Sequence, residues 1–419
     1  MFRVFSKVVT ETGRAGLTGG VSVSGGSFIT GCRGYSGQHR SFPRDRKTVS
    51  KALPRGEAGF GTHSPKLVDS TLVEEGLVRG ADVFWKDSAA LKLRRRARIA
   101  WEEGGPKRVL VVKKPEAKEA TAALRSIVDW LRERGLEPFV ERSVHRSECK
   151  DIAPFDPGED VDFCITLGGD GTVLHLASLF VKDVPLPPVL SFAMGTLGFL
   201  TPFDFKDYDE QLSRVLAPDQ TVGCTLRSRK RCEVYTSEGK LLGVHHVLNE
   251  CIIDRGHSAS TLTLEIFVDG QYITTVTADG VIIATPSGST AYSMTAGGPM
   301  VAPSVPCTLI TPVAPLSLSF RPLVLPESSD VIMHVAEHSK SRARACFDGK
   351  QQARLLKGSA VHLTASLYPL PMINMGRLDS DWYEGITQKL KWNASIVEPP
   401  SRPKGVPNGL SNGHGVHTT

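Results

Sequence analysis

One short segment of the chain places a carboxylate among glycines, where an apolar run gives way to a helix-forming run. The segment consists of Gly168, Gly169, Asp170, Gly171 and Thr172. Glycines let the backbone turn sharply and approach a phosphate chain without an intervening Cβ, and the N-terminus of a following helix attracts anions. Asp170 could accept a proton from a hydroxyl beside those phosphates. The segment predicts a phosphate-handling loop, although by itself it is also an ordinary tight turn.

Three further segments carry groups suited to holding a ligand. The longest, residues 279–292, reads DGVIIATPSGSTAY, so that an apolar strand leads into a hydroxyl-rich glycine turn. Such a turn can hydrogen-bond ribose, phosphate and amide groups. The other two are GTLGFL at 195–200 and the pair Asn249 and Glu250, whose amide and acid can bond an adenine edge and ribose hydroxyls. Taken singly, these two are a Gly-bounded turn with Phe199 in the core and an ordinary strand end.

In this order along the chain, the four segments resemble the NAD kinase family, most closely its eukaryotic branch. GGDGT alone resembles a loop shared by NAD kinases, diacylglycerol and sphingosine kinases and, more distantly, phosphofructokinases. Residues 279–292 decide among these families, because they are similar to the NAD kinase signature DGxxxSTPTGSTAY over its whole length, with Ala284 for the usual Ser. The resemblance runs from about Val109 to Trp392. The chain contains neither a GxxxxGK[ST] loop nor a GxGxxG fingerprint.

This resemblance implies a two-domain fold and a reaction. The expected fold is an α/β N-terminal domain with a Rossmann-like parallel sheet, followed by a β-rich C-terminal domain, with substrate in the cleft between them. The expected reaction is transfer of the γ-phosphate of ATP to the 2′-hydroxyl of the adenosine ribose of NAD, which gives NADP. Mg²⁺ or another divalent cation would bridge the ATP oxygens without dedicated protein ligands. The expected assembly is a homo-oligomer, either a dimer or a tetramer.

The resemblance also implies roles for individual residues. Asp170 would be the base that takes the hydroxyl proton. Phosphate would lie against Gly168, Gly169, Gly171 and Thr172. The NAD-binding residues would be Gly171, Phe199, Asn249, Glu250, Asp279, Thr290, Ala291, Tyr292 and Thr295. The alternatives are an organellar NADH kinase, a lipid kinase of the diacylglycerol or sphingosine type, and a non-catalytic NAD-binding protein.

Hydrophobic periodicity predicts the domain organisation. Strands are expected at 109–112, 138–141, 162–167 and 188–193, and helices at 116–134, 172–180 and 207–216. This alternation predicts a parallel sheet in an α/β domain at 90–219. Beyond it, apolar runs are separated by turn pairs such as Asp269 with Gly270, which predicts a β-rich domain at 220–392 with a last helix at 379–392. Residues 48–89 would be a linker and 393–419 a disordered tail.

The first 47 residues have the composition of a targeting segment. They contain eight Lys or Arg and only two acidic residues, with Phe2, Phe5 and Val9 at helical spacing. An amphipathic, Arg- and Ser-rich, acid-poor start is typical of a transit peptide. We therefore expect 1–47 to direct the protein to the mitochondrial matrix, the alternatives being a plastid, the cytosol or a plain Gly/Ser-rich tail.

The rest of the chain is electrically balanced, with 42 basic and 42 acidic residues. A neutral body offers no electrostatic footprint for nucleic acid, and no run of about 18 apolar residues is present for a membrane span. The eight cysteines are scattered without metal-site or disulfide spacing, which favours a reducing compartment. We expect small-molecule substrates, with no nucleic-acid or membrane partner.

Overall fold

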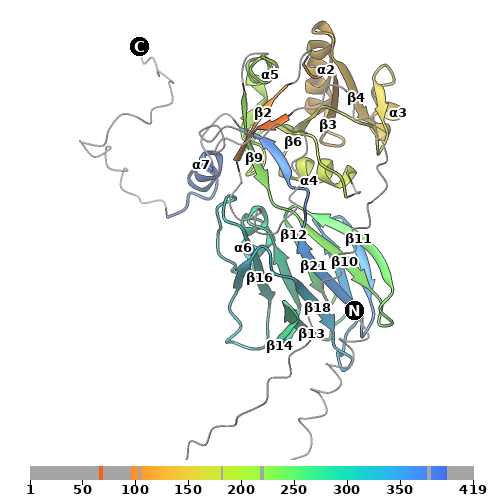
Figure 1. Cartoon of the computed structure of the whole chain (residues 1–419), viewed down its shortest axis with the longest axis vertical. Helices are drawn as coiled ribbons and strands as arrows, with labels where there is room; N and C mark the ends of the chain where they lie inside the picture. The colour runs from red at the N-terminus through yellow and green to blue at the C-terminus, as the bar shows by residue number, and fades with distance from the viewer. Residues whose placement is uncertain are drawn as a thin grey trace, which may run out of the picture. The chain divides into compact units, whose positions relative to one another are not determined.

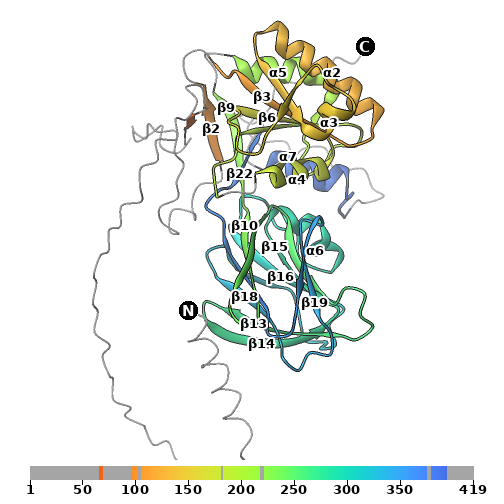
Figure 2. The same cartoon turned by 90° about the vertical axis from the view of Figure 1, so that its right-hand side faces the viewer.

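The computed structural model describes residues 66–68, 96–101, 105–180, 183–217, 221–374 and 379–393 (Figures 1 and 2). The chain divides into two compact units, Met1–Phe60 and Gly61–Thr419, and every described residue belongs to the second. The expected transit segment 1–47, nearly all of the expected linker and the tail beyond Asn393 lie outside the described residues.

Parallel strands and their helices form the N-terminal part of the described fold. The strands in parallel register are β3 (Arg108–Lys113), β4 (Glu137–Glu141), β5 (Ala153–Phe155), β6 (Phe163–Gly168), β7 (Val189–Ala193) and β8 (Phe203–Asp204). The helices are α2 (Lys118–Glu133), α3 (Arg142–Ser147), α4 (Asp170–Leu179), the 3-10 turn η2 (Phe205–Asp207) and α5 (Tyr208–Leu216). The α/β arrangement predicted from the sequence is confirmed; α3, β5 and β8 were not predicted.

Both faces of this sheet are buried, as continuous apolar strands require. On one face Val109 and Val111 of β3 share a core with α2, α3 and α5. On the other face Leu110 and Val112 share a core with α4, through Val173 and Leu176. The predicted apolar stripe of α2 is buried against the first face. The sheet thereby fixes the start of α4, where the glycine-rich loop lies.

The same sheet continues on one side with antiparallel strands. These are β1 (Lys66–Val68), β2 (Arg96–Ala100), β9 (Val222–Arg227) and β22 (Leu370–Ile373), and the full order is β1-β2-β9-β22-β7-β6-β3-β4-β5 with β8 beside β7. β9 lies beyond the expected domain boundary at 219/220, and β22 arrives from near the end of the expected β-rich domain. The expected boundary therefore needs correction, because the strands up to Arg227 still belong to the N-terminal sheet and the β-rich sheets begin only after this residue. Local apolar patterns do not reveal such long-range pairing.

Two antiparallel six-stranded sheets make up the β-rich part. One contains β10 (Lys230–Tyr235), β11 (Leu241–Val247), β13 (Leu262–Val268), β14 (Gln271–Ala278), β18 (Val331–Val335) and β21 (Ala360–Ala365). The other contains β12 (Glu250–Asp254), β15 (Gly280–Ala284), β16 (Cys307–Val313), β17 (Leu323–Pro326), β19 (Ala343–Phe347) and β20 (Gln351–Leu355). One core cluster joins them, with Val234 and Met333 from the first and Ile253 and Ile283 from the second. The two sheets therefore pack face to face.

Two predicted hairpin turns have the backbone that their sequences favour. Asp269 and Gly270 join β13 to β14 with φ of 50° and 81°, and Asp348 and Gly349 join β19 to β20 with φ of 46° and 72°. Two consecutive residues with positive φ are typical of the tight hairpin turns that Asp-Gly favours. The second turn becomes important for the ligand site.

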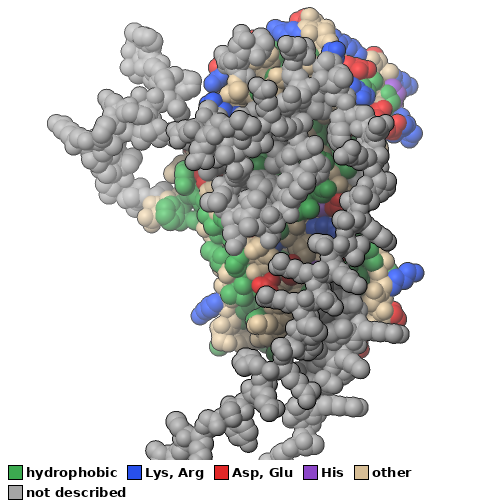
Figure 3. Space-filling model, viewed as in Figure 1, with side chains coloured by type: hydrophobic (Ala, Val, Ile, Leu, Met, Phe, Trp, Pro, Cys, Tyr) green, Lys and Arg blue, Asp and Glu red, His purple; other side chains and the backbone are tan. Residues whose placement is uncertain are grey.

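The last described helix, α7 (Ser380–Gln388), follows β22 and is shorter than the predicted 379–392. None of the described helices is long and apolar enough to cross a membrane. On the face drawn in Figure 3, Lys and Arg side chains are interspersed with Asp and Glu, as the balanced charge of residues 48–419 predicts.

Candidate functional site

Asp170 is the first residue of α4, directly after the carboxyl end of strand β6. Its Oδ2 accepts the backbone N–H of Phe199 at 2.9 Å, and its Oδ1 accepts the N–H of Leu200 at 2.9 Å and the hydroxyl of Thr201 at 3.4 Å. A carboxylate has about four acceptor positions. Three are used by one loop, which orients the carboxylate and leaves a position for a ligand.

The glycines around Asp170 fall into two kinds. A Cβ added at Gly198 would lie 1.8 Å from Oδ1 of Asp170, and one at Gly168 would lie 2.1 Å from Oγ1 of Thr172. These two glycines are needed for close packing within the protein. A Cβ at Gly169 or Gly171 would meet no atom within 4 Å. The predicted phosphate-binding loop therefore presents two glycines to open space at the N-terminus of a helix, which is the geometry that anions favour.

Asn249 and Glu250 are held in place by a residue almost a hundred positions away. The carboxylate of Asp348 accepts the backbone N–H groups of Leu248, Asn249 and Glu250 at 2.7, 2.8 and 3.1 Å. Leu248 in turn packs in the same core cluster as Val173 of α4. The predicted Asn-Glu pair thus follows a residue that shares a core with the helix that Asp170 begins.

Two polar atoms of this pair are buried with no hydrogen-bond partner among the described protein atoms: Oδ1 of Asn249 and Oε2 of Glu250. Leaving a buried polar group unpaired costs about 1–3 kcal/mol. Two such atoms on adjacent residues indicate a place where a ligand or ordered water supplies the missing partners.

Burial also raises the pKa values of Glu250 and Asp348. Desolvation raises the pKa of Glu250 to about 8, and the neighbouring Asp348 carboxylate adds to the effect. Burial raises the pKa of Asp348 to about 6, against the three N–H groups that favour its ionised form. At neutral pH Glu250 is therefore mainly protonated and can donate a hydrogen bond to a ligand oxygen.

The hydroxyl-rich turn after β15 packs directly against the Asn249 backbone. Thr285 donates its N–H to the carbonyl of Asn249 at 2.9 Å and its hydroxyl to the carbonyl of Leu248 at 2.5 Å. A Cβ added at Gly288 would lie 2.1 Å from the Asn249 carbonyl oxygen. This close approach requires glycine and brings the turn into the same site as Asn249 and Glu250.

The remaining predicted ligand residues follow on this turn, in the 3-10 turn η3 (Ser287–Thr290) and helix α6 (Tyr292–Thr295). Thr290 donates its hydroxyl to the Ser287 carbonyl at 3.2 Å, and Thr295 donates to the Tyr292 carbonyl at 2.8 Å. Ala291 joins the two elements. The side chain of Tyr292 is 43% exposed, which makes it available to a ligand.

Asp279 is the exception among the predicted residues. It directly precedes β15. The first residue of this strand, Gly280, pairs with Asp254, whereas the last residue, Ala284, pairs with Glu250. Four residues of strand separate these ends by about 13 Å, and Asp279 is bound there by Arg255, with Nε 2.7 Å from Oδ1. Asp279 therefore lies at the opposite end of β15 from the residue that pairs with Glu250, and its expected ligand role stays a prediction.

Helix α7 also belongs to this region, although the sequence motifs did not indicate it. A Cβ at Gly385 would lie 2.8 Å from Cε1 of Phe199, and Nζ of Lys389 lies 4.5 Å from the centre of the same ring. Arg227 donates through Nη2 to the Phe199 carbonyl at 3.5 Å and to Asp381 of α7 at 3.2 Å. The predicted Phe199 is therefore packed beneath α7.

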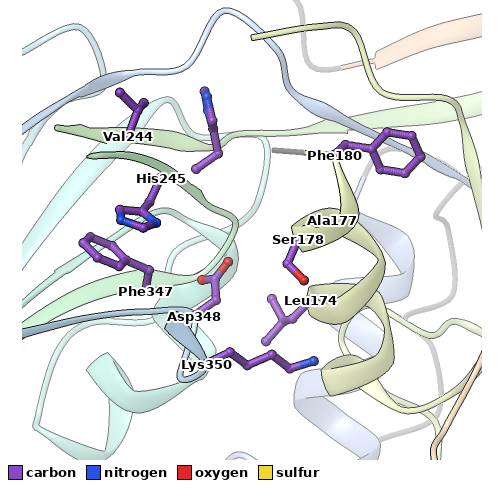
Figure 4. A pocket seen from close by; sticks show the side chains of 10 residues that line it. Leu174, Ala177, Ser178, Phe180, Val244, His245, Phe347, Asp348 and Lys350 are labelled. Carbon is purple, nitrogen blue, oxygen red and sulfur yellow. The ribbon is translucent and has the colours of Figure 1, made fainter. Parts of the chain in front are cut away.

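A small cavity of about 30 Å³ lies on another side of Asp348, between α4, β11 and the turn after β19 (Figure 4). Ser178, Asp348 and Lys350 supply polar lining, and His245 stacks on Phe347 with ring centres 4.1 Å apart. A volume of this size suits one or two waters. It is too small for a nucleotide.

The comparisons of sequence and fold with known proteins agree on one family. The ATP-NAD kinase N-terminal domain family model matches residues 109–220, and the ATP-NAD kinase C-terminal domain family model matches residues 248–375. A crystal structure of yeast NADH kinase complexed with NADH is 31% identical with a TM-score of 0.68, covering 74% of this chain and 93% of that one. An Archaeoglobus fulgidus NAD kinase structure at 22% identity and a TM-score of 0.54, covering 67% of this chain and 98% of that one, shares the fold.

Curated relatives include NAD kinase 2, chloroplastic, of Arabidopsis thaliana, 40% identical over 317 residues, or 70% of this chain and 31% of that protein. An uncharacterised kinase of Schizosaccharomyces pombe is 32% identical over 68% of this chain and 79% of its own length. The chain spans 31% to 62% of the length of the plant relatives it matches. With both domain models matched in order and most of the yeast structure covered, the chain belongs to the NAD kinase family.

Proposed function

We propose that this protein is an NAD kinase, which phosphorylates the 2′-hydroxyl of the adenosine ribose of NAD with ATP as donor and gives NADP. One observation carries the proposal. A carboxylate, Asp170, is oriented beside an open glycine loop. The helix that it begins shares a core cluster with Leu248, and the next two residues, Asn249 and Glu250, have buried polar atoms without a partner among the described residues. This arrangement provides a base, a phosphate cradle and unused hydrogen-bonding groups for a nucleotide.

In the proposed reaction, Asp170 takes the proton of the 2′-hydroxyl through its remaining acceptor position. The 2′-oxygen forms a bond to the γ-phosphorus, and the bond to the β,γ-bridging oxygen breaks with its electron pair leaving on ADP. Phosphoryl transfer depends mainly on positioning and on electrostatic stabilisation. The glycine loop with Gly169 and Gly171, together with Thr172 at the start of α4, would contribute backbone N–H groups to the phosphates.

The acceptor nucleotide would lie against the Asn249–Glu250 segment and the turn after β15. Protonated Glu250 donates to an oxygen of the ligand, and Oδ1 of Asn249 accepts from an amino or hydroxyl group. Thr290, Tyr292 and Thr295 contribute groups from the turn, and Phe199 bounds the site beneath α7.

The divalent cation would enter as part of the donor substrate. Among the described residues, no group of three or more His, Cys, Asp or Glu side chains is placed to hold a metal ion. Mg²⁺ carried by the phosphates of ATP fits this arrangement, because the glycine loop offers N–H groups to the phosphate oxygens that the cation leaves free.

NADH is the second candidate acceptor. It is favoured by the match to yeast NADH kinase and by a mitochondrial NADH kinase of Saccharomyces cerevisiae that is 36% identical over 57% of this chain and 66% of that protein. Residues 1–47 would then act as a transit peptide to the mitochondrial matrix, with a plastid or the cytosol as alternatives. A fusion of residues 1–50 to a fluorescent protein tests this, and a diffuse cytosolic signal would contradict it.

A homo-oligomer, either a dimer or a tetramer, is part of the proposal. Light scattering coupled to gel filtration of the full chain measures its mass directly, and a single species at 45.3 kDa would contradict self-association.

The activity itself is tested by NADP(H) formation with MgATP and either NAD or NADH. Faster product formation from NAD than from NADH supports the NAD kinase proposal. A strong preference for NADH makes the protein an NADH kinase. A folded protein that forms no product with either acceptor contradicts both.

A further inference from the structure

Helix α7 lies outside the regions that match the two family models, since the second match ends at residue 375. It is nevertheless fixed over the loop that orients Asp170. Gly385 lets the helix backbone approach the Phe199 ring so closely that a Cβ there would be 2.8 Å from Cε1. At its N-terminus, Asp379 accepts the hydroxyl of Ser304. The position of the helix is therefore set by a hydrogen bond at its N-cap and by packing of its middle against Phe199.

Lys389, the C-cap residue of α7, is the notable group at the end of this helix. Its Nζ lies 4.5 Å from the centre of the Phe199 ring, and the side chain is partly buried. Phe199 is also the residue whose N–H binds Oδ2 of Asp170 at 2.9 Å. The ammonium group thus lies over the ring of Phe199 and the Asp170 carboxylate binds the backbone N–H of the same residue, and the two charges interact.

Of the two cationic side chains near this loop, Arg227 forms an ion pair and Lys389 does not, within the described residues. Arg227 and Asp381 form an ion pair at 3.2 Å. Within the described part of the chain, no carboxylate lies within ion-pair distance of Nζ of Lys389, which lies over the aromatic face of Phe199. Desolvation lowers the pKa of Lys389, while the carboxylates of Asp170 and Asp381 act in the opposite direction. Because its Nζ makes no hydrogen bond among the described residues, the N–H donors of this ammonium remain available to an anionic ligand.

A simpler reading is that Lys389 only complements the dipole of α7, since cations are favourable at a helix C-terminus. That role needs no burial and no aromatic partner. Lys391, two residues further on, is exposed and serves as the comparison for a lysine near the same helix end.

We propose that Lys389 is a further catalytic residue, whose ammonium binds a γ-phosphoryl oxygen of the donor nucleotide while the phosphoryl group moves past Asp170. The γ-phosphoryl group brings its negative charge close to the Asp170 carboxylate, and a nearby cation offsets the repulsion between them. Lys389 donates hydrogen bonds and transfers no proton; the hydroxyl proton goes to Asp170 and the electron pair of the broken bond to ADP. This inference rests on the proposed kinase function.

The experiment compares the full-length protein with K389M, K389R and the control K391M. For each we would measure kcat, the KM values for MgATP and NAD, the Kd for NAD by calorimetry, and Tm. K389M should lower kcat by about 100-fold, with the Kd for NAD within twofold and Tm unchanged. K389R should have a kcat at least tenfold higher than that of K389M, because it restores the positive charge. K391M should have the kcat of the wild type.

The outcomes separate this inference from the proposed function. An active wild type with K389M turning over within threefold of it overturns the role of Lys389 and leaves the kinase proposal intact. Equal loss of activity in K389M and K389R, together with a lowered Tm, shows that Lys389 only holds α7 in place, and this also overturns the inference. A wild type that forms no NADP(H) from either acceptor overturns both.

Discussion

Asp348 binds the backbone of Asn249: its Oδ1 accepts the Asn249 N–H at 2.8 Å, across 99 positions of sequence. The same carboxylate accepts the N–H groups of Leu248 and Glu250. A hairpin turn of one strand pair therefore fixes the segment that we propose binds the nucleotide. Asp348 contacts no proposed reacting atom, so its role is to position Asn249 and Glu250.

Replacing Asp348 with Asn should disturb this positioning, because one carbonyl oxygen cannot accept all three N–H groups. We expect D348N to lower the free energy of unfolding by about 1–3 kcal/mol and to raise the Kd for NAD at least tenfold. Denaturant unfolding and calorimetry measure the two effects. The control is D269N, at the matching position of the other Asp-Gly turn, where the carboxylate accepts one N–H group, that of Asp330. Equal effects of D348N and D269N on NAD binding would contradict the positioning role.

The raised pKa of Glu250 predicts that NAD binding depends on pH. Its folded-state pKa of about 8 lies above the ordinary value of 4.5, so the folded protein holds a proton there that the unfolded chain releases. The resulting stabilisation is complete below pH 4.5 and is lost as pH rises towards 8, with a slope of at most about 1.4 kcal/mol per pH unit.

Above pH 7, NAD affinity should follow the protonated form of Glu250 and weaken through pH 8 to 9. In E250Q, which keeps a donor but cannot ionise, the Kd for NAD should be nearly independent of pH over this range. Calorimetric titrations at each pH test this. Parallel pH profiles of the wild type and E250Q would show that Glu250 does not titrate in the site.

A substitution at Gly171 should weaken phosphate binding without lowering the stability of the fold. Gly171 occupies the second position of α4, and an added Cβ would meet no protein atom within 4 Å. Alanine is favoured over glycine in a helix by up to about 1 kcal/mol, so G171A should keep or slightly raise Tm. The new methyl group would occupy the space proposed for phosphate, and the KM for MgATP should rise at least tenfold. An unchanged KM with a folded protein would remove Gly171 from the phosphate site.

Local sequence signals predicted the parts of the site that local structure builds. The strand before Gly168, the helix from Asp170 and the turn after Thr285 depend on contiguous residues, and they lie close to where the sequence placed them. Asn249 and Glu250 were predicted from a resemblance, since a dipeptide carries little information by itself. Their buried, unpartnered atoms appear only in the folded chain.

The features that the sequence did not predict depend on contacts between distant segments. β9 and β22 join the N-terminal sheet through pairing across almost 150 positions, as between Thr225 and Met372. Asp279 was placed with the ligand residues because it belongs to the same motif, but the length of β15 carries it to the far end of the strand. Helix α7 reaches Phe199 only through tertiary packing, which no local pattern encodes.

The most direct test of the proposed mechanism is the turnover of D170N with MgATP and NAD, measured beside the wild type. Asn at this position keeps the shape of the side chain and the acceptor for one of the two N–H groups of Phe199 and Leu200, but it cannot take up the hydroxyl proton. We predict that kcat falls by about 10²-fold to 10⁴-fold, while the protein stays folded with a modest fall in Tm and the Kd for NAD stays close to the wild-type value. Near-normal turnover by a folded D170N protein would contradict the role of Asp170 as the base.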